Sequence, residues 1–221
     1  TAATSVADIA ILMVDGKAGV QVGTEKAWAA AEGKAKILFV NNIDEENVDV
    51  LKVAGDLKEA LGKCVAPAYL PIKEGNEIVG YVNVIANEGK MYKAGGTEDV
   101  PVPANLKDEV DAARDSLFEA IAETDDALMD KYFNGEAYTE EEIKEGTKKG
   151  MLAGSFVPVI FGSAVKNIGV KALLTFICKF MPSPEDAQMR AAHKPGTGDA
   201  VEVKADPAAP VRLLFLKWQT V

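Results

Sequence analysis

The chain has 221 residues, of which 48% are hydrophobic and 26% charged, so it is long enough and apolar enough to bury a sizeable core. Its formal net charge of −10 argues against direct nucleic-acid binding, which depends on cationic groups that contact phosphates. The sequence shows neither an apolar run long enough to span a membrane nor a signal peptide, so we expect a cytoplasmic protein without a membrane partner.

The two cysteines, Cys64 and Cys178, lie far apart in the sequence, and neither belongs to a C-x-x-C pattern or has a histidine nearby. The spacing therefore indicates neither a disulfide nor a metal site. We expect both thiols to be reduced and buried in the core of an intracellular protein.

Residues 1–62 predict two strands that alternate with two helices. An apolar run at residues 9–14 precedes a glycine-rich turn, and Thr24 is a candidate N-cap for the first helix. A second apolar run occupies residues 37–40. Residues 45–61 then place apolar side chains at helical spacing. This β-α-β-α order implies a parallel sheet with right-handed crossovers, and hence an α/β fold.

Residues 63–155 follow a different pattern. Residues 65–72 contain two prolines, which favours an edge strand. Two runs at residues 80–85 and 90–93 flank a polar turn and predict an antiparallel meander. Three helices are then expected, at residues 106–123, 126–133 and 139–152, the last opened by a capping box. An α+β subdomain inserted into the α/β fold explains this change.

The α/β pattern resumes at residues 156–181, with an apolar strand and an apolar helix. Residues 182–208 are rich in Pro, Gly, Asp and Ala, which predicts a linker. Residues 209–221 begin one more strand, and another strand candidate follows almost directly after Thr1, which is not a start methionine. We therefore expect the chain to be a piece of a longer protein.

Polar residues follow the apolar run at 37–40. In open α/β sheets, ligands bind at the carboxyl ends of the strands. The carboxylate of Asp44 has two acceptor oxygens, which suit the adjacent N1 and N2 donors of guanine. Asn41, Asn42, Ile43 and Asp44 therefore predict a guanine-recognition loop. The plainer alternative is a turn at the end of a strand, because Asn and Asp are common turn residues.

A second small and polar strand end follows much later in the sequence, at Gly162, Ser163 and Ala164. In a parallel sheet both strand ends open on the same side. The presence of two polar strand ends on the same side of the sheet favours the guanine hypothesis over the simple turn.

Groups for other kinds of chemistry are missing from the sequence. A single histidine, His193, argues against a His-based triad or a His metal site. Neither the P-loop pattern G-x-x-x-x-G-K-[ST] nor an Asp-x-x-Gly turn occurs, and these supply the groups that bind the β- and γ-phosphates and Mg²⁺. We therefore predict no catalytic residue and no metal ligand in this chain.

Residues 41–44 match the N-K-x-D motif of translation elongation factor G, and residues 162–164 match the S-A motif of this family. Further similarity to the family lies at residues 19–28, 70–72, 122–126, 139–142, 162–170 and 181–184. Nearly the whole chain therefore resembles the back half of the family's GTPase domain. This resemblance implies a partial P-loop-type GTPase sheet with an inserted subdomain at residues 63–155, followed by the first strand of a β-barrel domain.

The resemblance also implies a role for each motif residue. Asp44 would accept hydrogen bonds from guanine N1 and N2, and Asn41 would contact the N7 side of the base and brace the loop. Ser163 would support the loop, and the backbone N–H of Ala164 would donate to guanine O6. Asn42 replaces the family's motif lysine and lacks its four-carbon stem and its charge. We therefore expect weaker nucleotide affinity or weaker guanine preference.

For the intact protein the resemblance implies GTP and GDP as ligands, with Mg²⁺ bound only through a missing upstream part. The intact protein would hydrolyse GTP on the ribosome to promote translocation. This chain carries the guanine-recognition side alone and would not hydrolyse GTP. Its inserted subdomain would meet the stalk of the large ribosomal subunit.

Two alternatives share the fold, namely a ribosomal protection protein of the tetracycline-resistance type and a release-factor GTPase. Their distal domains would distinguish them. A third alternative is a non-enzymatic interaction module in which Asn42 marks a decayed nucleotide site. The sequence upstream of Thr1 would separate a GTPase from such a module, since a P-loop and an Asp-x-x-Gly turn belong there in a GTPase.

Overall fold

The computed structural model describes residues 7–75, 77–93 and 95–183, together with Thr4, Asp186, Thr197 and residues 192–193 and 200–201. A parallel sheet has the strand order β1–β2–β8–β3. Its strands are β1 (Ile9–Asp15), β2 (Ala35–Asn41), β8 (Val157–Phe161) and β3 (Val65–Pro67). Every residue of β8 is buried, and so is β2 as far as Val40. This two-sided burial explains why both strands are almost continuous apolar runs.

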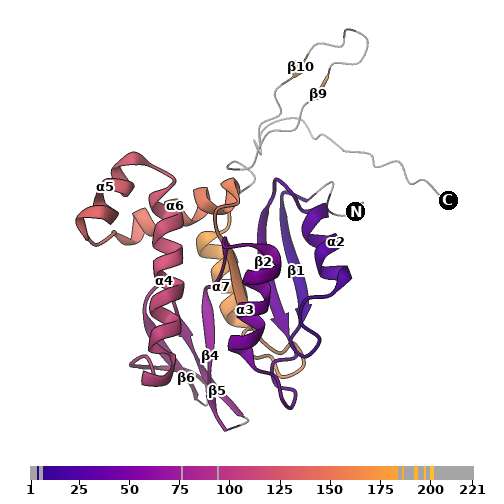
Figure 1. Ribbon diagram of the computed structural model, residues 1–221, viewed down its shortest axis with the longest axis vertical. Coiled ribbons are helices and arrows are strands. Elements are labelled where there is room, and N and C mark those ends of the chain that lie inside the picture. The colour runs from indigo at the N-terminus through magenta and orange to yellow at the C-terminus, as the bar shows by residue number, and fades with distance from the viewer. Residues whose placement is uncertain are drawn as a thin grey trace, which may run out of the picture.

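Helices cover both faces of the parallel sheet (Figure 1). They are α2 (Val22–Ala30), α3 (Val50–Leu61) and α7 (Val170–Phe180). On one face, Leu57 of α3 shares a core with Leu38 of β2. On the other face, Phe176 of α7 shares a second core with Phe39, the next residue of β2. Successive residues of a strand point to opposite faces, so β2 serves both cores. The expected α/β class is confirmed.

Between β3 and β8 the chain forms an antiparallel sheet and three further helices. The strands are β4 (Tyr69–Glu74), β5 (Glu77–Asn83), β6 (Glu88–Lys93) and β7 (Gly96–Val100), paired in that order. They precede the short 3₁₀ helix η1 (Ala104–Leu106) and the helices α4 (Lys107–Ala122), α5 (Asp126–Asn134) and α6 (Glu140–Ala153). We call residues 69–153 the inserted subdomain. The expected meander and helices are confirmed.

A single residue, Ala68, joins the two sheets. It is fully buried, its N–H donates to the carbonyl of Val159 at 2.9 Å, and its carbonyl accepts from the N–H of Val84 at 3.1 Å. The sequence assigns residues 65–67 to the insertion, and this is wrong, because β3 pairs with β8 in the parallel sheet. The prolines do mark an edge, since β3 is the last strand of that sheet.

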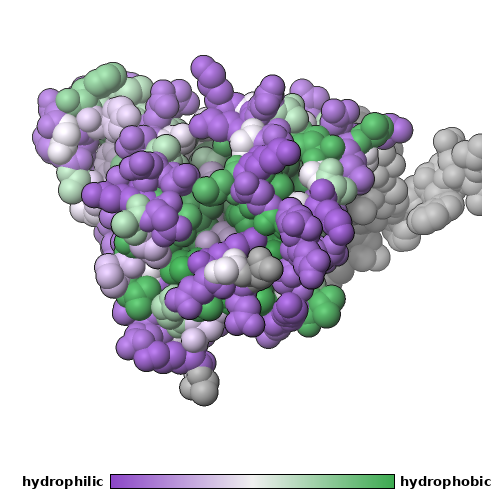
Figure 2. All heavy atoms as spheres, turned by 60° about the horizontal axis from the view of Figure 1, so that its bottom comes forward, coloured by the Kyte–Doolittle hydropathy of each residue, from purple (hydrophilic) through white to green (hydrophobic). Residues whose placement is uncertain are grey.

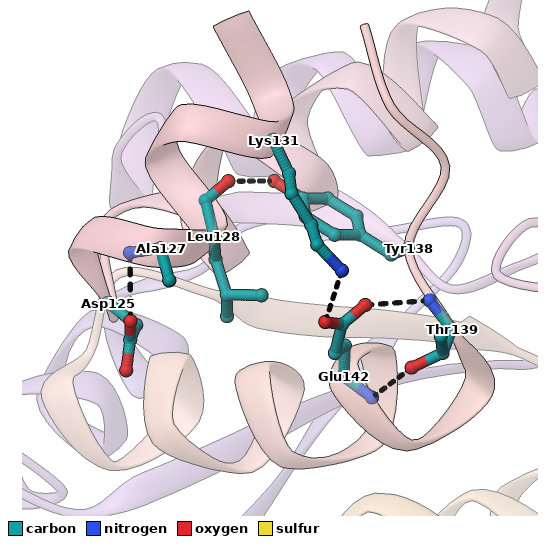
Figure 3. A network of polar contacts seen from close by, with 7 residues as sticks. All are labelled: Asp125, Ala127, Leu128, Lys131, Tyr138, Thr139 and Glu142. Carbon is teal, nitrogen blue, oxygen red and sulfur yellow. Dashed lines mark hydrogen bonds and ion pairs between the residues drawn. The ribbon is translucent and has the colours of Figure 1, made fainter. Parts of the chain in front are cut away.

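Polar contacts hold α5 against the start of α6 (Figure 3). Lys131 of α5 lies 2.5 Å from Glu142 of α6, and the Tyr138 hydroxyl donates to the carbonyl of Leu128 at 2.9 Å. Glu142 also accepts from the N–H of Thr139, whose hydroxyl accepts from the N–H of Glu142. The predicted capping box is therefore confirmed. No residue of α5 is fully buried, but Leu128 packs against the second core, so apolar and polar contacts together place this helix.

Two helices begin elsewhere than the sequence predicts. The helix expected from Thr24 begins earlier, with Gln21 as its N-cap, and the hydroxyl of Thr24 accepts a hydrogen bond from the N–H of Gln21. The helix expected from residue 45 begins only after Asp49. This carboxylate accepts hydrogen bonds from two N–H groups of the first turn and so caps the helix there.

The expectation that both cysteines are buried is wrong for Cys178, which is exposed. The helix α7 buries Ala172 and Phe176, and Cys178 comes two residues after Phe176, on the opposite side of the helix. Cys64 is half-buried.

Two short strands, β9 (Ala192–His193) and β10 (Ala200–Val201), pair in antiparallel fashion within the stretch where the sequence predicts a linker, residues 182–208. The strand expected at residues 209–221 lies outside the described residues. The β-barrel domain that this strand would open therefore stays a prediction.

The buried hydroxyl of Thr147 in α6 allows the cost of an unpaired polar group to be measured. It is 0% exposed, and its hydroxyl has no hydrogen-bond partner among the described residues. A buried hydroxyl without a partner costs free energy. We expect Thr147→Val, which replaces this hydroxyl with a methyl group, to raise the free energy of unfolding in urea by about 1 kcal/mol.

Thr124 provides the matched control, because its hydroxyl donates to the carbonyl of Ile121 at 2.7 Å. The same exchange, Thr124→Val, should lower the free energy of unfolding by about 1 kcal/mol. Stability changes of the same sign at both positions would contradict this interpretation.

Candidate functional site

The loops that follow β2 and β8 meet at the carboxyl end of the parallel sheet, which is the lower end of the molecule in Figure 1. We call them the β2–α3 loop (residues 42–49) and the β8–α7 loop (residues 162–169). The N–H of Ala164 donates to Oδ1 of Asn41 at 2.9 Å, and the N–H of Ile43 donates to the carbonyl of Gly162 at 3.3 Å. The two strand ends that the sequence singles out are therefore adjacent.

The carboxylate of Asp44 lies beside this junction. Its side chain is 18% exposed, and Oδ2 lies 3.3 Å from Nζ of Lys166 in the β8–α7 loop. A hydrogen bond from the Ser163 hydroxyl, with a smaller contribution from Lys166, lowers the pKa of the Asp44 carboxyl. The ionised carboxylate is a pure hydrogen-bond acceptor at neutral pH. The sequence does not predict the contact with Lys166, because no local pattern indicates which partner a single lysine in a loop will have.

Asn42 binds the end of β1. Its φ of 62° lies in the left-handed region, which asparagine tolerates better than most residues. Nδ2 donates to Oδ2 of Asp15 at 2.7 Å, and Oδ1 of Asp15 accepts from the N–H groups of Lys17 and Ala18. The bond from Ala18, followed by that from Asn42, lowers the pKa of the Asp15 carboxyl. Asn42, at the position of the motif lysine, therefore binds the β2–α3 loop to the end of β1 through Asp15. The sequence does not predict this role of Asp15.

Close packing at Gly162 fixes the start of the β8–α7 loop. A Cβ at this position would lie 2.4 Å from the carbonyl oxygen of Ile168 and 2.6 Å from Cζ of Phe39, so a larger residue would force movement. Ser163 and Ile168 exchange two backbone hydrogen bonds of 2.9 Å across the loop. This narrow turn buries Ser163 completely and leaves Ala164 exposed.

Ile43 anchors the β2–α3 loop in the core. It is 1% exposed and belongs to the same buried cluster as Val48. Asn41 and Asp44, on either side of the Asn42–Ile43 pair, stay partly exposed. The loop therefore has an apolar attachment and presents acceptor oxygens toward solvent.

A cleft of about 680 Å³ opens next to Asp44. Its walls come from the β2–α3 loop, β4 and η1, and they include Glu45, Glu46, Asp49 and Lys73. Figure 2 turns the lower end of Figure 1 toward the viewer and shows mostly hydrophilic side chains, with apolar side chains visible between them. This end of the molecule thus combines the two strand ends with an acidic recess.

Within the residues that the structure describes, no three His, Cys, Asp or Glu side chains gather in a way that could hold a metal ion. In the same part of the chain, no helix is both long enough and apolar enough to cross a bilayer. The groups present at the strand ends are a carboxylate, an amide, a buried hydroxyl and a backbone N–H. Such a set suits a flat polar heterocycle, which needs donors and acceptors at fixed positions.

A parallel sheet with helices on both faces, and polar groups at the carboxyl ends of two neighbouring strands, defines a nucleotide-binding type of α/β domain. The family model described as the elongation factor Tu GTP binding domain matches residues 1–183. The chain belongs to this family of translational GTP-binding domains.

A crystal structure of a protein from Thermus thermophilus is similar to this chain, with a TM-score of 0.73 and 35% sequence identity. The match covers 83% of this chain and 28% of that protein, so this chain spans well under half of its length. The resemblance to an elongation-factor-G-like translational GTPase is confirmed at the level of family and fold.

Two substitutions test how much the hydrogen bond from Asn42 to Asp15 and the backbone conformation of Asn42 contribute to stability. We expect Asn42→Ala to lower the free energy of unfolding by about 2 kcal/mol, through the lost hydrogen bond and an alanine held at positive φ. Asn42→Gly loses the bond without the backbone strain and should cost about 1 kcal/mol. Urea denaturation of the chain measures both values, and equal losses would show that the backbone conformation contributes nothing.

The cause of the low Asp44 pKa gives a second test. We expect Ser163→Ala to raise this pKa toward its ordinary value, and by more than Lys166→Met does, because the hydroxyl contributes most. Carboxyl-carbon NMR titration of the chain measures both shifts. A larger shift in Lys166→Met would contradict the assignment.

The lowered pKa of Asp44 also makes the stability of the fold depend on pH. The folded-state pKa of Asp44 lies below the unfolded-state value of about 3.9. Its stabilising contribution is therefore present above that unfolded-state value and is lost as the pH falls through the folded-state pKa. Ser163→Ala should reduce this acid-dependent loss of stability.

Proposed function

We propose that this chain is the guanine-recognition side of an elongation-factor-G-like GTPase, which in its intact form hydrolyses GTP on the ribosome to promote translocation. The observation that carries the proposal is the hydrogen bond between the Ala164 N–H and Oδ1 of Asn41, which joins the two strand ends with Asp44 beside them. Membership of the GTP-binding family supports GTP and GDP as the ligands.

The edge of guanine offers two donors, N1–H and the N2 amino group, beside the acceptor O6. Asp44 would accept from both donors in charge-assisted hydrogen bonds, with Ser163 holding the carboxylate in place. Lys166, whose side chain is 59% exposed, would move from Asp44 into solvent as the base enters. The N–H of Ala164 would turn from Asn41 to guanine O6, and Asn41 would contact the N7 side.

Phosphate binding, Mg²⁺ binding and hydrolysis are proposed for a part of the intact protein outside this sequence. The sequence contains neither a P-loop nor an Asp-x-x-Gly turn, so its own residues fit the base and not the phosphates. At the edge of the parallel sheet, β1 leaves Ile11 and Met13 exposed by 42% and 56%. These apolar side chains stand on one face of the edge strand, and we expect the phosphate-binding part to pack against that face.

The ribosome is the proposed partner, and the cytoplasm the proposed location, because both follow from the likeness to translational GTPases. Within the inserted subdomain, α5 lies far from the parallel sheet (Figure 1). This helix and the start of α6 expose acidic side chains at Asp126, Asp130, Glu140 and Glu141. We propose that this outer part of the subdomain meets the stalk of the large ribosomal subunit.

Nucleotide selectivity tests the site. In the intact protein, Asp44→Asn should reduce discrimination between GTP and xanthosine triphosphate by about 1.5–3 kcal/mol, because one charge-assisted hydrogen bond to guanine is lost. Competition binding with the two nucleotides measures this change.

Asp49→Asn is the matched control. It removes the same charge from the same loop, and asparagine still caps α3. Selectivity should therefore stay at the wild-type value. Unchanged discrimination in Asp44→Asn would overturn the site assignment, and an intact wild-type protein that prefers no guanine nucleotide would overturn the function.

A further inference from the structure

A lysine of the inserted subdomain holds the backbone of the β2–α3 loop. Lys73 lies on β4, and its Nζ donates to the carbonyl of Val48 at 2.8 Å. Val48 lies between Asp44 and the N-cap residue Asp49 in the same loop. The subdomain thus contacts the segment that carries the proposed acceptor for guanine.

This hydrogen bond joins two residues that line the acidic cleft next to Asp44, Lys73 and Val48. The Lys73 side chain is half-buried, and burial lowers the pKa of its ammonium group, against an opposing effect from Asp49. A partly desolvated ammonium needs a hydrogen-bond partner more than one in water does. The carbonyl of Val48 supplies that partner, so the bond resists displacement of the loop.

Apolar packing reinforces the same link. Val48 is buried in the core that contains Leu70 and Ile72 of β4. Ile43, the neighbour of Asp44, belongs to this core as well. Because interiors are closely packed, a shift of β4 would disturb both the polar and the apolar support of the loop.

The two ends of the loop are fixed differently. Its start is bound to the β8–α7 loop at the end of the parallel sheet, through Asn41 and the N–H of Ile43. Its far end is bound to the antiparallel sheet, through Lys73. Asp44 lies between these attachments, so its position depends on both sheets.

We propose that Lys73 is a positioning residue through which the inserted subdomain sets how firmly the β2–α3 loop holds guanine. Displacement of β4 would free Val48 and speed the release of the nucleotide. The inference rests on the proposed function and deepens it, because it gives the insertion control over nucleotide release.

The test measures release of a fluorescent GDP analogue from the intact protein. Lys73→Met keeps an unbranched apolar stem and removes the charged donor. We expect GDP to dissociate about three to ten times faster, with a matching loss of preference for GDP over xanthosine diphosphate. Lys73→Arg keeps a cationic donor and should stay within about twofold of the wild-type rate.

Lys93→Met is the matched control. Lys93 lies on the same antiparallel sheet and pairs with Glu98 at the surface, so the substitution makes the same charge change away from the loop. We expect it to leave both the release rate and the preference at wild-type values.

Two results would overturn the inference. One is a Lys73→Met protein that releases GDP at the wild-type rate, and the other is one that releases both diphosphates faster by the same factor. An intact wild-type protein without preference for GDP would instead refute the proposed function, so the two failures can be told apart.

Hydrogen exchange of the 221-residue chain gives a second measurement that needs no nucleotide. The backbone N–H groups of residues 45–50 should exchange faster in Lys73→Met than in Lys93→Met. Equal exchange in the two variants would also overturn the inference.

Discussion

The hydrogen bond between Oδ1 of Asn41 and the N–H of Ala164 joins residues that are 123 positions apart in the sequence. Each strand end by itself is an ordinary turn. Held together, they place an amide, a carboxylate and a backbone donor at distances set by the spacing of neighbouring strands. The site therefore exists only where β8 returns beside β2, with Phe161 opposite Val40.

The inserted subdomain has to bring the chain back to that position, and the packing shows how closely it is integrated. A single helix, α4, contributes Val110 to one core and Leu117 to the other. Leu70 of β4 shares the first core with Ile43 of the β2–α3 loop. The subdomain is thus part of the hydrophobic framework that supports the site.

The sequence predicts the fold class and the two strand ends well, because buried parallel strands are apolar throughout and their polar ends stand out. It predicts α4 for a similar reason, since Val110, Ala113 and Leu117 recur at helical spacing and are buried. It does not predict β7, whose residues are almost all exposed and which is attached to β6 through the backbone. Such a strand has no apolar alternation to reveal it.

The contacts within the site are harder to predict than its location. The bond from Asn42 to Asp15 and the ion pair of Asp44 with Lys166 join loops that follow different strands. Side-chain partners of this kind depend on how the loops pack, and no local pattern encodes them. The start of α2 illustrates the same limit, because threonine is typical of an N-cap, whereas Thr24 lies at the third helical position and accepts a hydrogen bond from the N–H of the N-cap residue Gln21.

The joint at Ala68 has a mechanical consequence. One fully buried residue separates the two sheets; its N–H donates to Val159 of β8, and its carbonyl accepts from Val84 in the turn that follows β5. Bending the chain there would break both hydrogen bonds, so the connection is stiff. The two sheets are therefore coupled at this residue, and a displacement of β4 would also strain the hydrogen bond from Ala68 to β8.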